Sequence, residues 1–504
     1  MSDVSLSVFI VLLVMVLAFG IGMIAYFRRI SDSTVDFFVA SRTLGFVALF
    51  FTYTATYHSA SAFLGTGGFF YKHGMAYWAL GPFTQIIGGL CLFIFGYRIW
   101  LLGKKYDYVT PGDMLGDFYQ SDFLRALIGI LGALFIIPYI QMQLAGAGWI
   151  AEFATFGAIS YAWGAIGLGV FVVIYVFFGG IRSVVWTDIF MGIFMFLAIV
   201  VGGALISTAL WGSPGEIWQM IYRETPGQLV LPGAPGYFKL PMAFSWVVII
   251  TIGLSITAPH MIIRMFAAGS LRVLKWVAIL APLYLVWIYV SYIWLGMGAR
   301  AAMPGIEFAD QILPRFTFEY LPVWLAALIA AGGLCATLST ADSQLLTTAQ
   351  LIGRDVYEKT INKKAKDRTV LGISRAAVIC IFIFSAWAVL EPPQLLSMLV
   401  AVSTAGLSQF FPSIVGCLFW PRATKAGAIS GLIVGTLIAI YFLFINKMNP
   451  WGMHPGFVGL IFNIIVFTVV SYLTPPQPPE VIAKFHGFMD SDEARQMIKE
   501  SLNN

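Results

Sequence analysis

Charge is scarce in this sequence. Of its 504 residues only 11% are charged, whereas 59% are hydrophobic. Soluble domains carry about 25% charged residues, so a chain of this length cannot cover itself with a polar surface and needs lipid as its solvent. The net charge of +5 is modest and its basic residues are spread over short loops. That dispersal excludes the concentrated basic face of a nucleic-acid-binding protein.

Cysteine and the motifs of several other protein classes are also sparse. Four cysteines occur, none paired at metal-ligand spacing, which predicts small buried apolar side chains: Cys91, Cys335, Cys380 and Cys417. No Walker motif is present, which disfavours an ATP-driven pump. The five histidines show no ligand spacing, so we do not expect an enzyme. The short tail after Pro475 cannot form a signalling domain, which disfavours a solute sensor.

Long hydrophobic runs are what the sequence has instead. A bilayer core of about 30 Å needs about 20 apolar residues in a helix, and only helices satisfy the backbone of such runs. About thirteen runs predict an all-α polytopic membrane protein, with residues 1–474 as one transmembrane domain and 475–504 as a short cytoplasmic tail. The expected spans are 5–27, 43–70, 76–102, 123–150, 158–179, 184–210, 241–262, 274–300, 321–350, 369–389, 394–418, 425–446 and 454–474.

Basic residues between these spans predict the orientation. The first run is too long for a signal-peptide core, so we expect it to be retained, with the N-terminus outside the cell membrane and the C-terminus in the cytoplasm. The inner loops then hold Arg28, Arg29, Arg42, Lys104, Lys105, Arg125, Arg182, Arg264, Arg272, Lys275, the basic residues of 354–368, Arg422 and Lys425. The outer side keeps fewer, and its loops 211–240 and 301–320 are expected to cap an outer vestibule.

Residues 51–68 are unusually polar for a membrane span. Seven hydroxyl-bearing side chains lie between Thr52 and Ser61, with His58 among them. Small polar residues can simply join helices. Their density nevertheless favours a broken helix that lines a cavity. An unwound segment frees carbonyl oxygens for a cation, and the second half-helix offers its N-terminus to a carboxylate.

A second polar cluster lies in 332–344. Ser339, Thr340, Asp342 and Ser343 fall within about one helical turn, and Ser339 and Ser343 share a face. Hard oxygen ligands at this density suit Na⁺. A third cluster, in 178–188, places Asp188 inside the following span, where a carboxylate needs a partner. Either Arg182 is that partner or Asp188 belongs to a cation site.

These segments together resemble the sodium:solute symporter family. The resemblance covers nearly the whole chain, and its most specific parts are Gly179-Gly-Ile-Arg-Ser-Val-Val-Trp-Thr-Asp188 and Leu338-Ser-Thr-Ala-Asp-Ser-Gln-Leu-Leu346. Residues 52–65, 71–74, 103–106 and 109–115 look most like the pantothenate branch among its monocarboxylate and proline relatives. The resemblance implies a LeuT-like core of two inverted five-helix repeats, about 43–210 and 241–418, with one helix before them and two after.

The resemblance also implies ion ligands. The main sodium site would use the carbonyls of Ala55, His58 and Ala336 with the hydroxyls of Ser339 and Thr340. A second cation site would use Asp188, Ser339, Asp342 and Ser343. Position 342 is a carboxylate where some relatives have a hydroxyl, so this second site would hold either Na⁺ or a proton on one acid.

The solute pocket is expected near the membrane midplane, where broken helices meet. Candidate solute-binding residues are Thr54, Tyr57, Ser59, Ser61, Gln85, Gln141, Gln143, Ser255 and Gln409. They describe a neutral hydrogen-bonding pocket, which fits a small monocarboxylate, pantothenate or an amino acid better than a sugar phosphate. We therefore expect Na⁺-coupled symport of such a solute into the cell by alternating access, with a monomer sufficient. The alternatives are a proton-coupled symporter and a membrane-embedded solute sensor.

Overall fold

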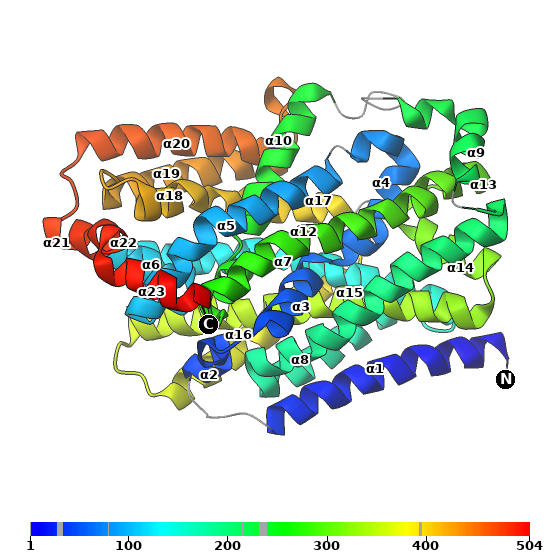
Figure 1. The fold of residues 1–504 in the computed structure, drawn as a ribbon, viewed down its shortest axis with the longest axis horizontal. Helices are drawn as coiled ribbons and strands as arrows, with labels where there is room; N and C mark the ends of the chain where they lie inside the picture. The colour runs from blue at the N-terminus through cyan, green and yellow to red at the C-terminus, as the bar shows by residue number, and fades with distance from the viewer. Residues whose placement is uncertain are drawn as a thin grey trace.

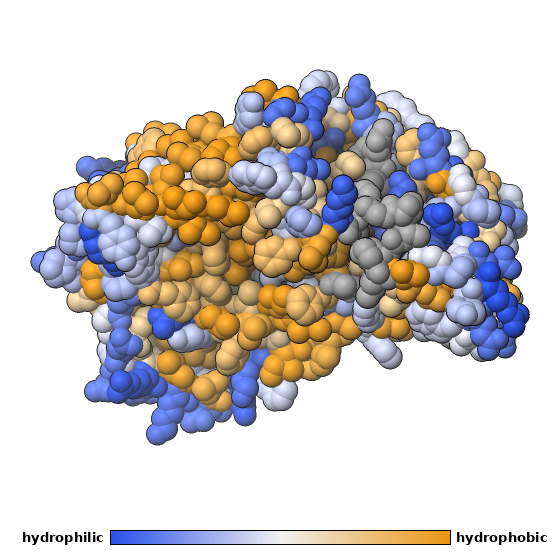
Figure 2. Space-filling view, turned by 90° about the horizontal axis from the view of Figure 1, so that it is seen from above, coloured by the Kyte–Doolittle hydropathy of each residue, from blue (hydrophilic) through white to orange (hydrophobic). Residues whose placement is uncertain are grey.

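The fold was analysed in a computed structural model, which describes residues 2–27, 34–78, 80–213, 215–230, 239–392 and 396–503. Throughout these ranges the regular structure is helical, apart from one isolated bridge between Leu44 and Ala268. The long helices lie side by side along the longest axis of the molecule (Figure 1). Figure 2 shows apolar side chains over the middle of one face and polar ones gathered toward its ends, as a membrane-embedded protein requires.

The first half of the chain contains six spans. They are built from α1 (Asp3–Phe27), α3 (Phe46–Tyr57) with η2 (Ser61–Gly65) and α4 (Thr66–His73), α5 (Gly81–Tyr106), α7 (Asp122–Ala154), and the two halves of α8 (Tyr161–Trp211). Short helices connect them or precede them: α2 (Thr34–Val39), η1 (Ala40–Arg42), η3 (Gly74–Tyr77), α6 (Pro111–Phe118), α9 (Glu216–Glu224) and η4 (Pro226–Leu229).

The second half contains seven spans. They are α10 (Leu240–Thr251) with η5 (Ile252–Ile256) and α11 (Pro259–Ala267), α12 (Leu271–Tyr292) with η6 (Ile293–Gly298) and α13 (Ala299–Ala302), α15 (Val323–Gln350) with η8 (Leu351–Ile361), α16 (Asp367–Ala388), α17 (Leu396–Leu407) with η9 (Ser408–Phe410) and α18 (Phe411–Phe419), α19 (Lys425–Ile440) with η10 (Tyr441–Ile445), and α20 (Pro455–Leu473). Between them lie η7 (Ala309–Gln311), α14 (Ile312–Tyr320) and η11 (Pro450–Gly452).

Two features of the chain reconcile these helices with the number of spans expected. By length and composition the described residues hold 10 membrane-length helices, or 11 with the pair α10–α11, which bends by 41°. The 51 residues of α8 would extend about 77 Å, which is more than twice a bilayer core. Gly180 divides α8 with φ +57°, a conformation that suits glycine. With α8 as two spans and α3–α4 as one interrupted span, the arrangement agrees with the predicted thirteen.

Helix α15 lies at the centre of the bundle. Of the most apolar 18 residues within Val323–Ile361, 78% are buried. The corresponding share is 28% in each of the peripheral helices α1 and α16. It packs against α8, α7 and α3. A central position explains how this helix can carry many hydroxyl groups, because its neighbours rather than lipid surround them.

The two ends of the bundle carry different connections. The N-terminus, α9, α13 and α14 lie toward one end, and α6 and the C-terminal helices toward the other (Figure 1). The loop elements η7 and α14 pack on α4, and Gln228 donates to the Tyr71 carbonyl at 3.0 Å. Both long loops expected on the outer side therefore cover the second half of the broken helix. Arg28 and Arg29, used above for orientation, lie outside the described residues.

The tail folds back onto the helix bundle. It forms α21 (Pro479–Ile482), η12 (Ala483–Gly487), α22 (Phe488–Asp490) and α23 (Asp492–Asn503). Phe485 is buried, with its ring 5.1 Å from that of Phe118. Farther along, the Leu271 N–H donates to Ser501 Oγ at 2.6 Å. The tail thus contacts both α6 in the first half and the start of α12 in the second.

Candidate functional site

The break in the first polar span lies against α15. Helix α3 ends at Tyr57, the next residue, His58, is non-helical (φ −86°, ψ 81°), and helical structure resumes by Ser61. Across this gap the Ala60 N–H donates to the Gln143 side-chain oxygen at 2.8 Å. Gly146, one turn farther along α7, leaves room for the approach, because a Cβ there would lie 2.6 Å from that of Ala60. A side chain on α7 therefore replaces the hydrogen bond that the interrupted helix loses.

The hydroxyls of α15 reach backbone carbonyls of α3 beside the break. Ser339 Oγ lies 3.1 Å from the Ala55 carbonyl oxygen, and Thr340 Oγ1 lies 3.1 Å from that of Thr56. Both hydroxyls also approach the Ala336 carbonyl, at 3.3 and 3.2 Å. The structure thus brings together four of the five groups expected to form the main sodium site, those of Ala55, Ala336, Ser339 and Thr340.

These groups have the chemistry that a bare monovalent cation needs. Ala55, Ala336, Ser339 and Thr340 are fully buried, and His58 is 1% exposed. The non-helical ψ of His58 turns its carbonyl out of the helical hydrogen-bond pattern. Neutral carbonyl and hydroxyl oxygens can replace the water molecules around such a cation, and they do so without burying a negative charge. Within the described residues, neither ring nitrogen of His58 has a hydrogen-bond partner.

A second buried polar group lies beside α3, on the N-terminal side of the break. Its side chains are Thr52, Thr56, Tyr175, Asp188, Asp342 and Ser343. Thr52 donates to Asp188 Oδ2 at 2.6 Å, and Tyr175 donates to Asp342 Oδ2 at 2.7 Å. The hydroxyls of Thr56 and Ser343 are 2.8 Å apart. Both carboxylates are fully buried, and in the part of the chain that is described the Oδ1 atom of each lacks a hydrogen-bond partner.

Two arginines, Arg182 and Arg264, have other partners or positions than the sequence predicts. Arg182 was one candidate partner for Asp188, but it pairs with Asp36 at 2.7 Å. Arg264, which the sequence assigned to an inner loop, is 3% exposed and lies 3.6 Å from Asp188 Oδ2. The loop assignment of Arg264 is wrong because α11 continues past the break at residues 257–258 and carries this side chain inward.

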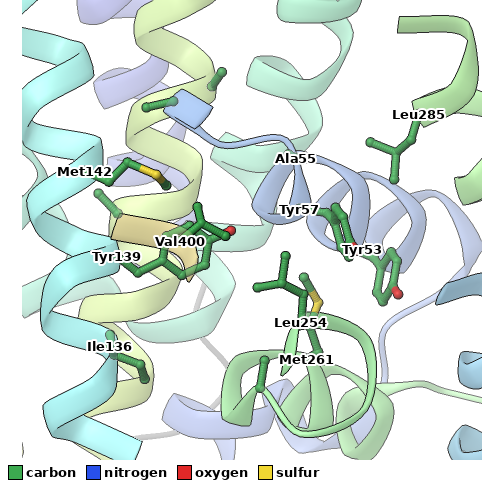
Figure 3. Packing of buried hydrophobic residues seen from close by; sticks show 14 of the residues in the cluster. Tyr53, Ala55, Tyr57, Ile136, Tyr139, Met142, Leu254, Met261, Leu285 and Val400 are labelled. Carbon is green, nitrogen blue, oxygen red and sulfur yellow. The ribbon is translucent and has the colours of Figure 1, made fainter. Parts of the chain in front are cut away.

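A cavity opens on the other side of the break. It holds about 590 Å³ of space outside protein atoms, part of it open solvent. Figure 3 shows Tyr139 of α7 and Val400 of α17 on one side of the same region, with Tyr57 of α3 and Leu254 of η5 on the other. The lining is Tyr57, Ser59, Ser61, Ala62, Thr66, Tyr77, Leu80, Gly81, Thr84, Gln85, Tyr139, Trp246, Val247, Ile250, Leu254, Tyr289, Ser397 and Val400.

The residues predicted to bind solute divide into two sets. Tyr57, Ser59, Ser61 and Gln85 line the cavity. The others are engaged with protein groups: Thr54 with the Phe50 carbonyl, Gln141 with the Ala388 carbonyl, Gln143 with Ala60, Ser255 with the Tyr57 hydroxyl, and Gln409 with the Ala405 and Gly456 carbonyls.

Sequence reasoning missed several aromatic side chains of the cavity. Tyr77, Tyr139, Trp246 and Tyr289 contribute to its wall, and the Gln85 amide donates to the Tyr289 hydroxyl at 3.4 Å. Aromatic residues are common throughout this chain, at 16%, so composition alone could not single these four out. What these four residues share is a position on the wall of one cavity, which only the fold reveals.

A cluster of buried oxygens and a polar cavity that meet at one helix break are typical of a secondary transporter. Residues 37–435 match the model of the sodium:solute symporter family, and the chain belongs to that family. It is a sodium-coupled solute symporter, a multi-pass protein of the plasma membrane, and not an enzyme.

The chain is similar to two bacterial transporters over most of its length. It is 28% identical to the sodium/pantothenate symporter of Escherichia coli over 464 residues, covering 90% of this chain and 94% of the relative. It is 26% identical to a high-affinity proline transporter of Bacillus subtilis over 493 residues, covering 94% and 99%.

A solved structure supports the fold. A Na⁺-coupled sialic acid symporter in its substrate-bound outward-open state superposes with a TM-score of 0.79 at 18% sequence identity, covering 94% of this chain and 98% of the other. The LeuT-like architecture expected from the sequence is confirmed.

Proposed function

We propose that this symporter carries a small monocarboxylate, pantothenate or an amino acid, which binds in the cavity beside the helix break. One observation carries the proposal: residues 55–61 contribute ion ligands at one end and cavity-lining side chains at the other. An ion and a solute held by the same short segment stabilise each other's site, which is what coupling requires.

The lining supports this solute class. Of the described residues around the cavity, none is an ionised side chain at neutral pH. A phosphorylated solute would have to bury two charges there without a partner, at high cost. A single carboxylate can instead rest near the sodium ion and the start of η2, while the hydroxyl and amide groups of Ser59, Ser61 and Gln85 bind its polar atoms. The names of the pantothenate and proline relatives agree with this class.

For the ion, we propose the carbonyls of Ala55, His58 and Ala336 with the hydroxyls of Ser339 and Thr340. Sodium at this place would attach the broken helix to α15 and favour the conformation open to the outside. The solute then completes the site, and the inner end opens where sodium is scarce. With the N-terminus outside and the tail in the cytoplasm, an inward sodium gradient drives uptake, since each charge gains about 2.3 kcal/mol per 100 mV.

Uptake into proteoliposomes tests the proposal. Purified protein is reconstituted, and radiolabelled pantothenate, proline and lactate are offered with an inward gradient of Na⁺ or, as control, of K⁺ at equal pH. We expect accumulation of one of the three, at least tenfold above the K⁺ control, and its collapse with a sodium ionophore. Equal uptake in Na⁺ and K⁺ would contradict the coupling, and no uptake of any of the three would contradict the solute class.

A further inference from the structure

The guanidinium of Arg264 lies inside the second buried polar group. Its Nη2 is 2.5 Å from both Thr56 Oγ1 and Ser343 Oγ. Its Nε is 3.1 Å from the Thr52 carbonyl oxygen and 3.2 Å from Thr52 Oγ1, and its Nη1 is 3.0 Å from the His260 carbonyl oxygen. Asp188 Oδ2 lies 3.6 Å away, so oxygen atoms of five residues lie close to this guanidinium.

Two of those oxygens belong to residues expected to bind a second cation, Asp188 and Ser343. A hard cation of sodium's size lies about 2.3–2.6 Å from its oxygen ligands. An ion on Ser343 Oγ would therefore lie within about 5 Å of a positively charged nitrogen, which is itself 2.5 Å from that oxygen. The hydroxyl of Ser339, another expected ligand, is directed to the Ala55 and Ala336 carbonyls of the main site. The guanidinium and a second ion would therefore repel each other and compete for the same oxygens.

Charge supports the same assignment. The group holds two carboxylates, Asp188 and Asp342, and one guanidinium, all nine-tenths or more buried. Buried carboxylates need a positive partner or a proton. Arg264 supplies that positive charge permanently, because its guanidinium stays protonated in proteins. Whichever acid carries a proton, removal of the guanidinium leaves the group more negative by one charge.

The contacts of Arg264 also reproduce the structural role of a bound ion. From α11 it joins α3 through Thr52 and Thr56, α15 through Ser343, and α8 through Asp188. A lysine ammonium is compact and could not reach these groups at once, whereas the planar fork of arginine does.

We propose that Arg264 is a built-in second cation, so that this chain binds one sodium ion per transport cycle and not two. The proposal rests on the main sodium site assigned under the proposed function. It also predicts a latent site: without the guanidinium, the unpartnered Oδ1 atoms of Asp188 and Asp342, together with the Ser343 hydroxyl, become available to an ion.

Counting bound sodium tests this inference. Saturation binding of ²²Na⁺ to purified protein in lipid nanodiscs should reach one ion per wild-type molecule, with a Hill slope of one. Arg264→Met should reach two. Arg264→Met with Asp188→Asn should return to one, because the double substitution removes a ligand and restores the net charge. Arg182→Met is the matched control, since Arg182 pairs with Asp36 outside this group, and it should stay at one.

The possible results separate the two proposals. Two sodium ions on the wild-type protein would overturn the role of Arg264 while leaving sodium coupling intact. One ion on folded Arg264→Met, verified by a monodisperse elution profile, would also overturn it. If Arg264→Met fails to fold, the wild-type count of one ion or two still decides. No sodium bound to the wild-type protein would instead contradict the main ion site.

Discussion

Ser339 on α15 places its hydroxyl 3.1 Å from the carbonyl oxygen of Ala55 on α3, across 284 positions of the sequence. Thr340 repeats the relationship with Thr56 one residue later. A cation between the two helices can bind oxygens from both at once. If sodium binds as proposed, the strength of the contact between α3 and α15 would depend on its presence, and the ion would control the position of the broken helix.

Removal of the two hydroxyls should weaken sodium binding. We expect Ser339→Ala with Thr340→Ala to raise the sodium concentration for half-maximal uptake about 30- to 150-fold, because each lost ligand is worth about 1–1.5 kcal/mol. Uptake as a function of Na⁺ concentration measures this. Thr348→Ala is the control, since Thr348 bonds only to the Gln344 carbonyl in its own helix. An unchanged sodium dependence in the double variant would disprove the site.

Gln143→Leu should impair solute and sodium binding together. It leaves the buried Ala60 N–H without its acceptor, at a cost of about 1–3 kcal/mol to the conformation of the break. Gln141→Leu is the matched control, because Gln141 lies on the same helix but donates to the Ala388 carbonyl. Equal losses of solute affinity in the two variants would argue against a special role for Gln143.

Asp310 should make the stability of the loop that covers α4 depend on pH. Burial raises the pKa of this loop carboxyl to about 6, against the opposing effects of the Leu396 N–H and Lys72. The unfolded chain has a pKa near 3.9, so between about pH 4 and 6 the folded form binds more protons. This contribution stabilises at low pH and is lost as pH rises through 6.

The test compares wild type with Asp310→Asn, whose amide oxygen can still accept from the Leu396 N–H. We expect the variant to gain up to about 3 kcal/mol relative to wild type at pH 7.5, and this gain to disappear near pH 4. Melting temperatures in detergent at several pH values would show it. A difference between the two proteins that does not change with pH would contradict the prediction.

Phe485→Ala should destabilise the packed tail far more than loss of a surface ion pair. The Phe485 ring is 1% exposed and packs near Tyr106, Tyr108 and Phe118, so truncation should cost about 3–5 kcal/mol of local stability. Lys105→Ala, the control, removes only a half-exposed pair with Glu493, worth at most about 1 kcal/mol. Protease sensitivity of residues 475–504 measures both. Similar sensitivity in the two variants would mean that the aromatic packing does not hold the tail.

The sequence allowed the spans and the break near His58 to be predicted, because hydropathy and hydroxyl density are local properties. It also singled out Ser339 and Thr340, which share one face of an apolar helix. Whether these residues meet Ala55 is a tertiary property, and its expectation rested on the family resemblance. The structure supplies that contact.

What the sequence could not show depends on the direction of single side chains. Arg264 looks like a loop residue in any count of basic positions, because counting ignores the helix face. Its burial follows from partners 79 and 208 positions away, Ser343 and Thr56. Likewise, Gln141 and Gln143 look equivalent in sequence, yet they bond to different helices. The folded tail was missed because its apolar residues are too few to form a recognisable run.

Three of the five oxygens assigned to the ion come from the main chain, at Ala55, His58 and Ala336. A mutation cannot replace a peptide oxygen with a different ion ligand. Substitution at these positions therefore alters the site only by changing the backbone conformation. Selection on ion choice must then act on two hydroxyls and on the shape of one interrupted helix. Related chains could therefore diverge widely around this place while still handling the same ion.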